Sequence, residues 1–174
     1  NRNFDALLEL VIEATVRFLE LQARAGADAL MLFDSWASAV PAHARDHVVS
    51  DPVAQIIDQL ARRGIRKPVI GFPKGIGEGL VRYCELSGVR AVGIDHGTDI
   101  RWAVQHLPKD IVLQGNLDPM TLIDAGKKMQ DSIAEILDVC SGRPHIFNLG
   151  HGITPETPVE HVDRLLEMIG AAGS

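Results

Sequence analysis

The sequence predicts an α/β fold with a parallel sheet, on three observations. Short apolar segments of strand length alternate with longer segments in which apolar residues recur every three or four positions. The short segments have no alternating polar face, which is typical of strands buried on both sides. Their starts, near residues 29, 69, 91, 111 and 145, are on average about 29 residues apart, a spacing that fits right-handed βαβ units.

Each element follows from a local pattern. Strands are expected over residues 29–33, 68–72, 91–94, 111–115 and 145–149. Helices are expected over residues 4–25, 51–63, 77–87, 100–106, 121–140 and 157–169. Gly26, Gly64 and Gly88 come directly after helical patterns, where glycine commonly ends a helix. Asp51 and Pro52 are expected to begin the second helix, as N-cap and first-turn proline.

Composition narrows the class of protein. The 174 residues include 46% hydrophobic and 23% charged residues, which excludes a disordered chain and suffices for one domain over residues 1–174. No apolar run approaches the roughly 18 residues of a membrane span. No signal peptide is visible before the first helix, so we expect a cytoplasmic protein without membrane association. The first residue is not Met, which is compatible with a piece of a longer chain.

Charge and cysteine content also narrow the expected partners and the expected state of the thiols. The net charge of -6, with scattered cations, argues against a nucleic-acid partner, which needs a clustered basic face. The one basic cluster, Arg62, Arg63, Arg66 and Lys67, is interpreted as a solvated helix end. Cys84 and Cys140 lie in helical patterns far apart in sequence, and we expect two reduced, buried thiols rather than a disulfide or a metal pair.

Two architectures fit this order of elements. A doubly wound sheet would be complete with five strands, whereas a (β/α)₈ barrel of about 250 residues would have only its last five or so units here. The periodicity does not choose between them. Residues 33–38, after the first strand, contain no glycine, so the dinucleotide-binding fingerprint is missing.

Polar residues gather after each predicted strand, where parallel α/β proteins place their functional loops. The simplest interpretations are structural: Asp34 caps a turn, residues 71–77 form a tight turn, and Asp118 is a helix N-cap. Asp95, His96 and Asp99 are interpreted as a solvated loop rather than a metal site. The segment 148–152 favours function, because glycines flank an imidazole at a strand end.

Three of these segments together resemble one family. Residues 33–37 (FDSWA), 113–119 (LQGNLDP) and 145–153 (HIFNLGHGI) are similar to the C-terminal half of uroporphyrinogen decarboxylases. Residues 68–75 and 92–95 resemble that family too, so the similarity covers nearly the whole chain. The resemblance implies a (β/α)₈ barrel, to which this chain contributes roughly the last five β/α units. It also implies decarboxylation of the four acetate side chains of uroporphyrinogen III to give coproporphyrinogen III, without a metal or an organic cofactor.

The resemblance also assigns site residues. Ser35 matches the family's substrate-contacting serine, Phe33 would lie beside the macrocycle, and His151 matches the active-site histidine. The family's essential aspartate, its arginine motif and its substrate-binding tyrosine are expected before residue 1. Tyr83, in a predicted helix, is not that tyrosine. We therefore expect the 174 residues alone to be inactive.

Two alternatives stay open. One is a zinc-dependent methyltransferase acting on corrinoid proteins and coenzyme M, from a family that resembles the decarboxylases in fold. Zinc needs His and Cys ligands at strand ends, and both cysteines here lie in helical patterns. The other is a non-catalytic fragment that acts as a scaffold.

Apart from the substrate, the expected partner is a second copy of the protein in a homodimer, because unpaired strand edges and apolar strand faces drive association.

Overall fold

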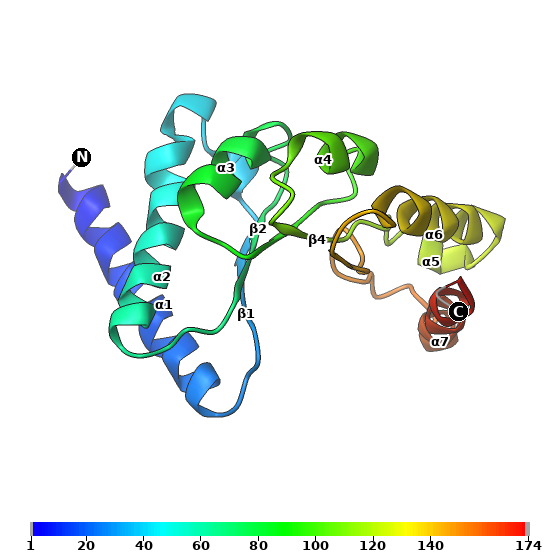
Figure 1. The fold of residues 1–174 in the computed structure, drawn as a ribbon, viewed down its shortest axis with the longest axis horizontal. Coiled ribbons are helices and arrows are strands. Elements are labelled where there is room, and N and C mark those ends of the chain that lie inside the picture. The colour runs from blue at the N-terminus through cyan, green and yellow to red at the C-terminus, as the bar shows by residue number, and fades with distance from the viewer. Residues whose placement is uncertain (1, 173–174) are drawn as a thin grey trace. The chain divides into compact units, whose positions relative to one another are not determined.

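The computed structural model describes residues 2–172, shown as a ribbon in Figure 1. Two compact units divide the chain, Asn1–Val92 and Gly93–Ser174. All the strand ladders that join neighbouring strands within these units are parallel, and the strand order follows the chain order. The predicted parallel α/β fold is confirmed.

The first unit contains the longest strands. β1 (Leu30–Asp34) pairs with β2 (Val69–Pro73) over its full length, and β2 pairs with the start of β3 (Ala91–Gly93). The helices of this unit are α1 (Arg2–Arg24), α2 (Asp51–Arg62) and α3 (Gly79–Ser87). Figure 1 shows α1 and α2 side by side, in blue and cyan.

The core of the first unit comes from one side of each helix. α1 buries Ile12, Val16, Leu19 and Ala23, and these positions recur every three or four residues. α2 adds the buried residues Pro52, Ile56 and Leu60. Each fully buried aliphatic side chain contributes about 1.5–3 kcal/mol, so this packing holds the helices on the strands.

A second side of α1 is apolar and exposed. Leu7, Leu10, Val11, Phe18 and Leu21 are between 52% and 67% exposed. The apolar pattern that predicts the helix therefore includes two faces, and only one of them is covered within residues 2–172. Apolar surface of this extent is typical of a face that packs against another element or chain.

The second unit has short strands and more helix. It contains β4 (Val112–Gln114), β5 (His145–Ile146) and α4 (Ile100–His106). Three more helices complete it: α5 (Thr121–Asp124), α6 (Lys127–Cys140) and α7 (Val159–Ala172). β4 and β5 pair at only two positions, and one further bridge joins Leu117 to Leu149.

The structure corrects four details of the predicted elements. The helix expected over 121–140 is two helices, because Ala125 has a left-handed φ of 46° and Gly126 is extended. Asp51 is not an N-cap, since a π-helical turn (Asp46–Ser50) runs directly into α2. The last helix begins at Val159 rather than 157. The last three strands are shorter than expected, as their later residues turn toward the loops.

Two further expectations concern single features. Cys84 on α3 and Cys140 on α6 are buried and form no disulfide. Burial raises the pKa of the Cys140 thiol, although the nearby positive charge of Arg143 opposes the shift. Among the described residues, no helix combines the length and the apolar character that crossing a membrane requires.

Candidate functional site

The carboxyl ends of β1 and β2 carry two aromatic rings. Phe33 and Phe72 are partners in the ladder, and their rings meet edge to face with centroids 6.1 Å apart. Phe72 is buried at 6% exposure, whereas Phe33 is 69% exposed. A buried ring thus supports an exposed one, which gives the end of the first strand a rigid apolar surface.

The residues after Phe33 form a tight turn. An Asp34 carboxylate oxygen accepts a hydrogen bond from the Trp36 backbone N–H at 3.2 Å, as the turn-cap interpretation predicts. The Asp34 carbonyl accepts a further bond from the Lys74 N–H at 3.0 Å, so the loops after β1 and β2 are joined. Ser35 and Trp36 are both exposed on this turn. The hydroxyl of Ser35 is therefore available at the strand end.

Tyr83 lies beneath β2 rather than in the strand-end loops. A Cβ atom on Gly71 would lie 2.1 Å from the Tyr83 Oη, so the buried phenol occupies the space that a side chain on β2 would fill. Burial raises the pKa of Tyr83, and the phenol stays neutral. Tyr83 lies in α3, as the predicted helix over residues 77–87 implies. The tight turn expected over 71–77 is also present, with left-handed φ angles at Gly75 and Gly77.

In the second unit, Asp95 organises the loop after β3. It is buried at 7% exposure, and its carboxylate accepts bonds from the Gly97 N–H at 2.9 Å and the Thr98 hydroxyl at 3.2 Å. The interpretation of residues 95–99 as a solvated loop is therefore wrong for Asp95, although His96 and Asp99 are exposed. Asp99 accepts a bond from the Arg101 N–H and is the N-cap of α4.

Asn116 joins two strand-end loops. Its side-chain amide donates to the carbonyls of Asp95 at 3.2 Å and Thr98 at 2.7 Å. The neighbouring Asp118 accepts a bond from the Met120 N–H, so it caps the turn before α5 rather than the first turn of α5 itself. Asn116 is only 8% exposed, so its two hydrogen bonds to Asp95 and Thr98 are shielded from water and hold the two loops together.

The segment that holds His151 is also fixed by its neighbours. The Leu117 N–H donates to the Asn148 carbonyl, and the Gly150 N–H donates to the Leu117 carbonyl at 2.8 Å. A Cβ atom on Gly150 would lie 2.2 Å from the backbone nitrogen of His96, so glycine alone permits this approach. His151 is exposed directly after this contact. Two imidazoles, His96 and His151, therefore lie on loops that touch.

His145 is a residue to which the sequence interpretation assigned only a strand. Its Nε2 lies 2.7 Å from the Gly115 carbonyl oxygen. Burial lowers the pKa of His145, the hydrogen bond to Gly115 opposes this, and the positive charge of Arg143 adds to it. The half-buried ring thus helps fasten β5 to the end of β4. A histidine opening a strand gives no sequence signal for such a bond.

The predicted site residues divide between the two units. Phe33 and Ser35 lie together on the first strand end of the first unit, and His151 lies in the second unit. Within residues 2–172, no three His, Cys, Asp or Glu side chains gather closely enough to hold a metal ion.

The parallel strands follow the chain order without the reversal of a doubly wound sheet, which is the order of a (β/α)₈ barrel, so the fold is that of a partial barrel. The fold resembles that of a methyltransferase from Methanosarcina mazei, with a TM-score of 0.79 at 18% identity over 95% of this chain and 48% of that one. The model of the uroporphyrinogen decarboxylase (URO-D) family matches residues 1–171, and the chain belongs to this family.

Curated relatives agree with the family model. The chain is 47% identical to a uroporphyrinogen decarboxylase of Hyphomonas neptunium, covering 94% of this chain and 48% of the relative. It is 44% identical to that of Maricaulis maris and 45% identical to that of Granulibacter bethesdensis, at 95% coverage of this chain and 48% of each relative. The chain thus spans about half the length of the curated relatives it matches.

Proposed function

We propose that the protein acts as a uroporphyrinogen decarboxylase when a complete barrel is present, with residues 1–174 as the C-terminal part of that single domain. The reaction converts uroporphyrinogen III to coproporphyrinogen III in tetrapyrrole biosynthesis. The observation that carries the proposal is the family match over residues 1–171, in a chain whose three motif segments lie at strand carboxyl ends.

The chemistry explains what such a site must supply. In each of four steps, an acetate side chain loses CO₂ and its methylene carbon gains a proton, which leaves a methyl group. The electrons of the breaking carbon–carbon bond need a sink, and protonation of the pyrrole provides one. A fixed carboxylate near the pyrrole N–H groups stabilises the resulting cation, so neither a metal nor an organic cofactor is needed.

The described residues fit the supporting roles in this reaction. The exposed Phe33 ring, braced by Phe72, offers an apolar surface to the macrocycle. The exposed Ser35 hydroxyl can donate to a substrate carboxylate and position it. His151 can donate a hydrogen bond to a substrate carboxylate or take part in proton transfer. These roles for Phe33, Ser35 and His151 are part of the proposal.

The main charges of the site belong to other parts of the barrel in this proposal. Uroporphyrinogen carries eight carboxylates, and cationic donors must hold those that do not react. The catalytic aspartate and the arginine motif are expected in the half of the relatives that this chain does not cover. Residues 1–174 by themselves are therefore proposed to be inactive.

The proposed assembly is a cytoplasmic homodimer that binds neither nucleic acid nor membrane. The exposed apolar side of α1 supports association, with either the rest of the barrel or a second copy. The net charge of -6 and scattered cations give nucleic acid no basic face.

The alternatives are less well supported. The methyltransferase of Methanosarcina mazei shares the fold at 18% identity, which indicates shape and not chemistry. The thiols of Cys84 and Cys140 are buried on helices, away from the strand-end loops where a catalytic zinc would need them. A non-catalytic scaffold role predicts no turnover from any form of the protein, and the assay below separates it from the decarboxylase.

The test is an anaerobic decarboxylation assay on the longest natural chain that contains these residues. His151→Asn should lower kcat/KM at least tenfold, and Ser35→Ala should lower it only a few-fold, because the serine positions without moving a proton. His106→Asn, at the exposed end of α4, is the matched control and should leave turnover unchanged. Unchanged kinetics in the His151 variant would remove that residue from the site, and no decarboxylation by the wild-type protein would overturn the proposed function.

A further inference from the structure

A cavity of about 300 Å³ lies at the amino end of β2, the opposite edge of the sheet from the loops described above. Three segments of the first unit line it: the C-terminal half of α2, residues 65–69 that lead into β2, and the loop with Gly88 and Arg90 that leads into β3. We call it the α2–β2 cavity. Its volume is at the lower end of the range for small-molecule sites in proteins.

The inner wall of the α2–β2 cavity is apolar and rigid. Leu60 is 2% exposed and Val69 is 3% exposed, so both belong to the core of the first unit. Ile57 and Ala61, one helical turn apart on α2, complete this wall. An apolar ligand body placed here would cover surface that otherwise faces water.

The rim of the cavity is cationic. Arg66, Lys67 and Arg90 line it, and Arg66 and Arg90 are exposed. In the part of the chain that the structure describes, neither of these two guanidinium groups has an ion-pair or hydrogen-bond partner. Within residues 2–172, the only ion pair of Lys67 is with Asp28, whose side chain is fully exposed, at 3.8 Å.

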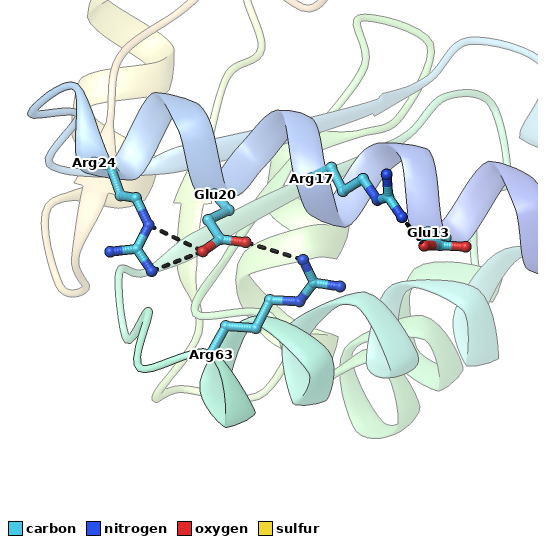
Figure 2. Close-up of polar contacts among 5 residues, drawn as sticks. All are labelled: Glu13, Arg17, Glu20, Arg24 and Arg63. Atoms are coloured by element: carbon cyan, nitrogen blue, oxygen red, sulfur yellow. Dashed lines mark hydrogen bonds and ion pairs between the residues drawn. The ribbon is translucent and has the colours of Figure 1, made fainter.

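Five other arginines of the first unit differ from those of the rim, because each of them pairs with a carboxylate. Arg24 and Arg63 both bind Glu20, as Figure 2 shows together with the Arg17–Glu13 pair. The remaining pairs are Arg62–Asp58 and Arg82–Asp46. In a chain of net charge -6, cations without carboxylate partners beside a cavity mark a place that attracts an anion.

We propose that the α2–β2 cavity binds a small organic anion with an apolar body. The body would pack on Leu60 and Val69, and its carboxylate or phosphate group would accept charge-assisted hydrogen bonds from Arg66 and Arg90. This site is separate from the proposed decarboxylation site, because it lies at the amino rather than the carboxyl end of the strands. The proposed anion site therefore does not depend on the proposed decarboxylase function.

The experiment measures ligand binding calorimetrically at low salt, on the longest natural chain that contains these residues. The probes are 2-naphthyl phosphate and 2-naphthoate, with 2-naphthol and inorganic phosphate as the apolar and anionic halves. At least one of the two naphthyl anions should bind one to one, at least tenfold more tightly than either half. The comparison of these two anions shows whether the rim prefers phosphate or carboxylate.

The variants locate the site. Arg66→Gln and Arg90→Gln should each weaken binding about tenfold, and Ala61→Leu should abolish it by filling the cavity. Arg62→Gln is the matched control, because Arg62 is on the same helix end but pairs with Asp58 and does not line the cavity. The bound anion should also shift the methyl NMR signals of Leu60 and Val69.

Several results would overturn the proposal. They are no binding by either naphthyl anion, equal binding of 2-naphthol, or binding that Arg66→Gln and Arg90→Gln leave unchanged. A change of oligomeric state in these two variants, without anion binding by the wild type, would instead identify the surface as a subunit contact.

Discussion

The two units hold their strand ends in different ways. In the first unit, β1 and β2 pair at five consecutive positions, and apolar packing from α1 and α2 covers them. In the second unit, β4 and β5 pair at two positions. There, side chains donate to backbone carbonyls instead: Asn116 to Asp95 and Thr98, and Arg143 to four carbonyls of the segment 104–111.

This difference concerns how backbone polar groups are satisfied. A backbone ladder satisfies its own polar groups, so the paired strands β1 and β2 need only apolar cover. In the second unit, carbonyls of the loop after β3 and of the segment from the end of α4 to the start of β4 need other donors, and the side chains of Asn116 and Arg143 supply them. Single polar substitutions should therefore destabilise the second unit more than the first.

The largest effect is expected from Gly150→Ala. The new Cβ would lie 2.2 Å from the His96 nitrogen, and because the obstacle is backbone, the loops must separate. We expect a loss of at least about 3 kcal/mol in the free energy of unfolding, measured by urea denaturation. Gly152→Ala, in the same loop with nothing within 4 Å of its Cβ position, is the control and should change stability by less than about 0.5 kcal/mol.

The corresponding substitution in the first unit is Gly71→Ala. Its new Cβ would lie 2.1 Å from the Tyr83 Oη, so the obstacle is a side chain rather than backbone. We expect about 2 kcal/mol of destabilisation, and Tyr83→Phe should restore part of it by removing the closest atom. Equal costs for Gly71→Ala and Gly150→Ala would contradict the distinction between side-chain and backbone contacts.

Arg143→Met should have the next largest effect. Arg143 donates to the carbonyls of Pro108 at 2.8 Å and Ile111 at 2.7 Å, and its removal leaves part-buried acceptors without donors. We expect a loss of about 1–2 kcal/mol, with Arg143→Lys intermediate because an ammonium cannot reach both carbonyls as a fork does. Arg101→Met breaks an exposed pair with Glu135 in the same unit and should cost less than about 1 kcal/mol. Similar losses in both variants would argue against the carbonyl clamp.

A smaller effect should come from acidification through His145. Its pKa is held below the usual 6.5 by burial, so the unfolded chain binds a proton at a higher pH than the folded one. Stability of the second unit should fall as pH drops below 6.5 and level off below the folded pKa. Hydrogen exchange, corrected for its intrinsic pH dependence, should show this slope in the second unit and its reduction in His145→Asn. A slope that the variant leaves unchanged would assign the effect to other groups.

The smallest effect is expected at Glu20. Hydrogen bonds from Arg24 and then Arg63 hold the pKa of this carboxyl below its usual 4.5. Its contribution is therefore fully present above pH 4.5 and is lost as pH falls through the folded pKa. Glu20→Gln should lower the melting temperature slightly at pH 7, less than Arg143→Met does, and the difference from wild type should vanish in acid. Added salt should shrink it too, since the pairs of Figure 2 lie at the surface.

Much of the candidate site was predictable because it depends on chain order. Strand carboxyl ends are located by where apolar runs stop, so the sequence places Phe33 at the end of a strand and Ser35 and His151 in loops, whereas their proposed roles come from the family resemblance. The roles of Asp95 and His145 could not. A carboxylate looks the same in a sequence whether water or a neighbouring loop surrounds it, and its burial depends on residues far along the chain.

The sequence by itself determined the alternation of helices and strands, their parallel arrangement and the family of the chain, because these depend on short-range periodicity and on motif residues. Only the tertiary structure decided which apolar face of α1 is covered, where the helix of residues 121–140 breaks, and which side chains donate to the loop carbonyls of the second unit. Those features arise where groups distant in sequence compete for the same space or the same hydrogen bond. Local sequence patterns do not reveal that competition. For this reason Arg66 and Lys67, which line the α2–β2 cavity, were interpreted from the sequence as part of a solvated helix end.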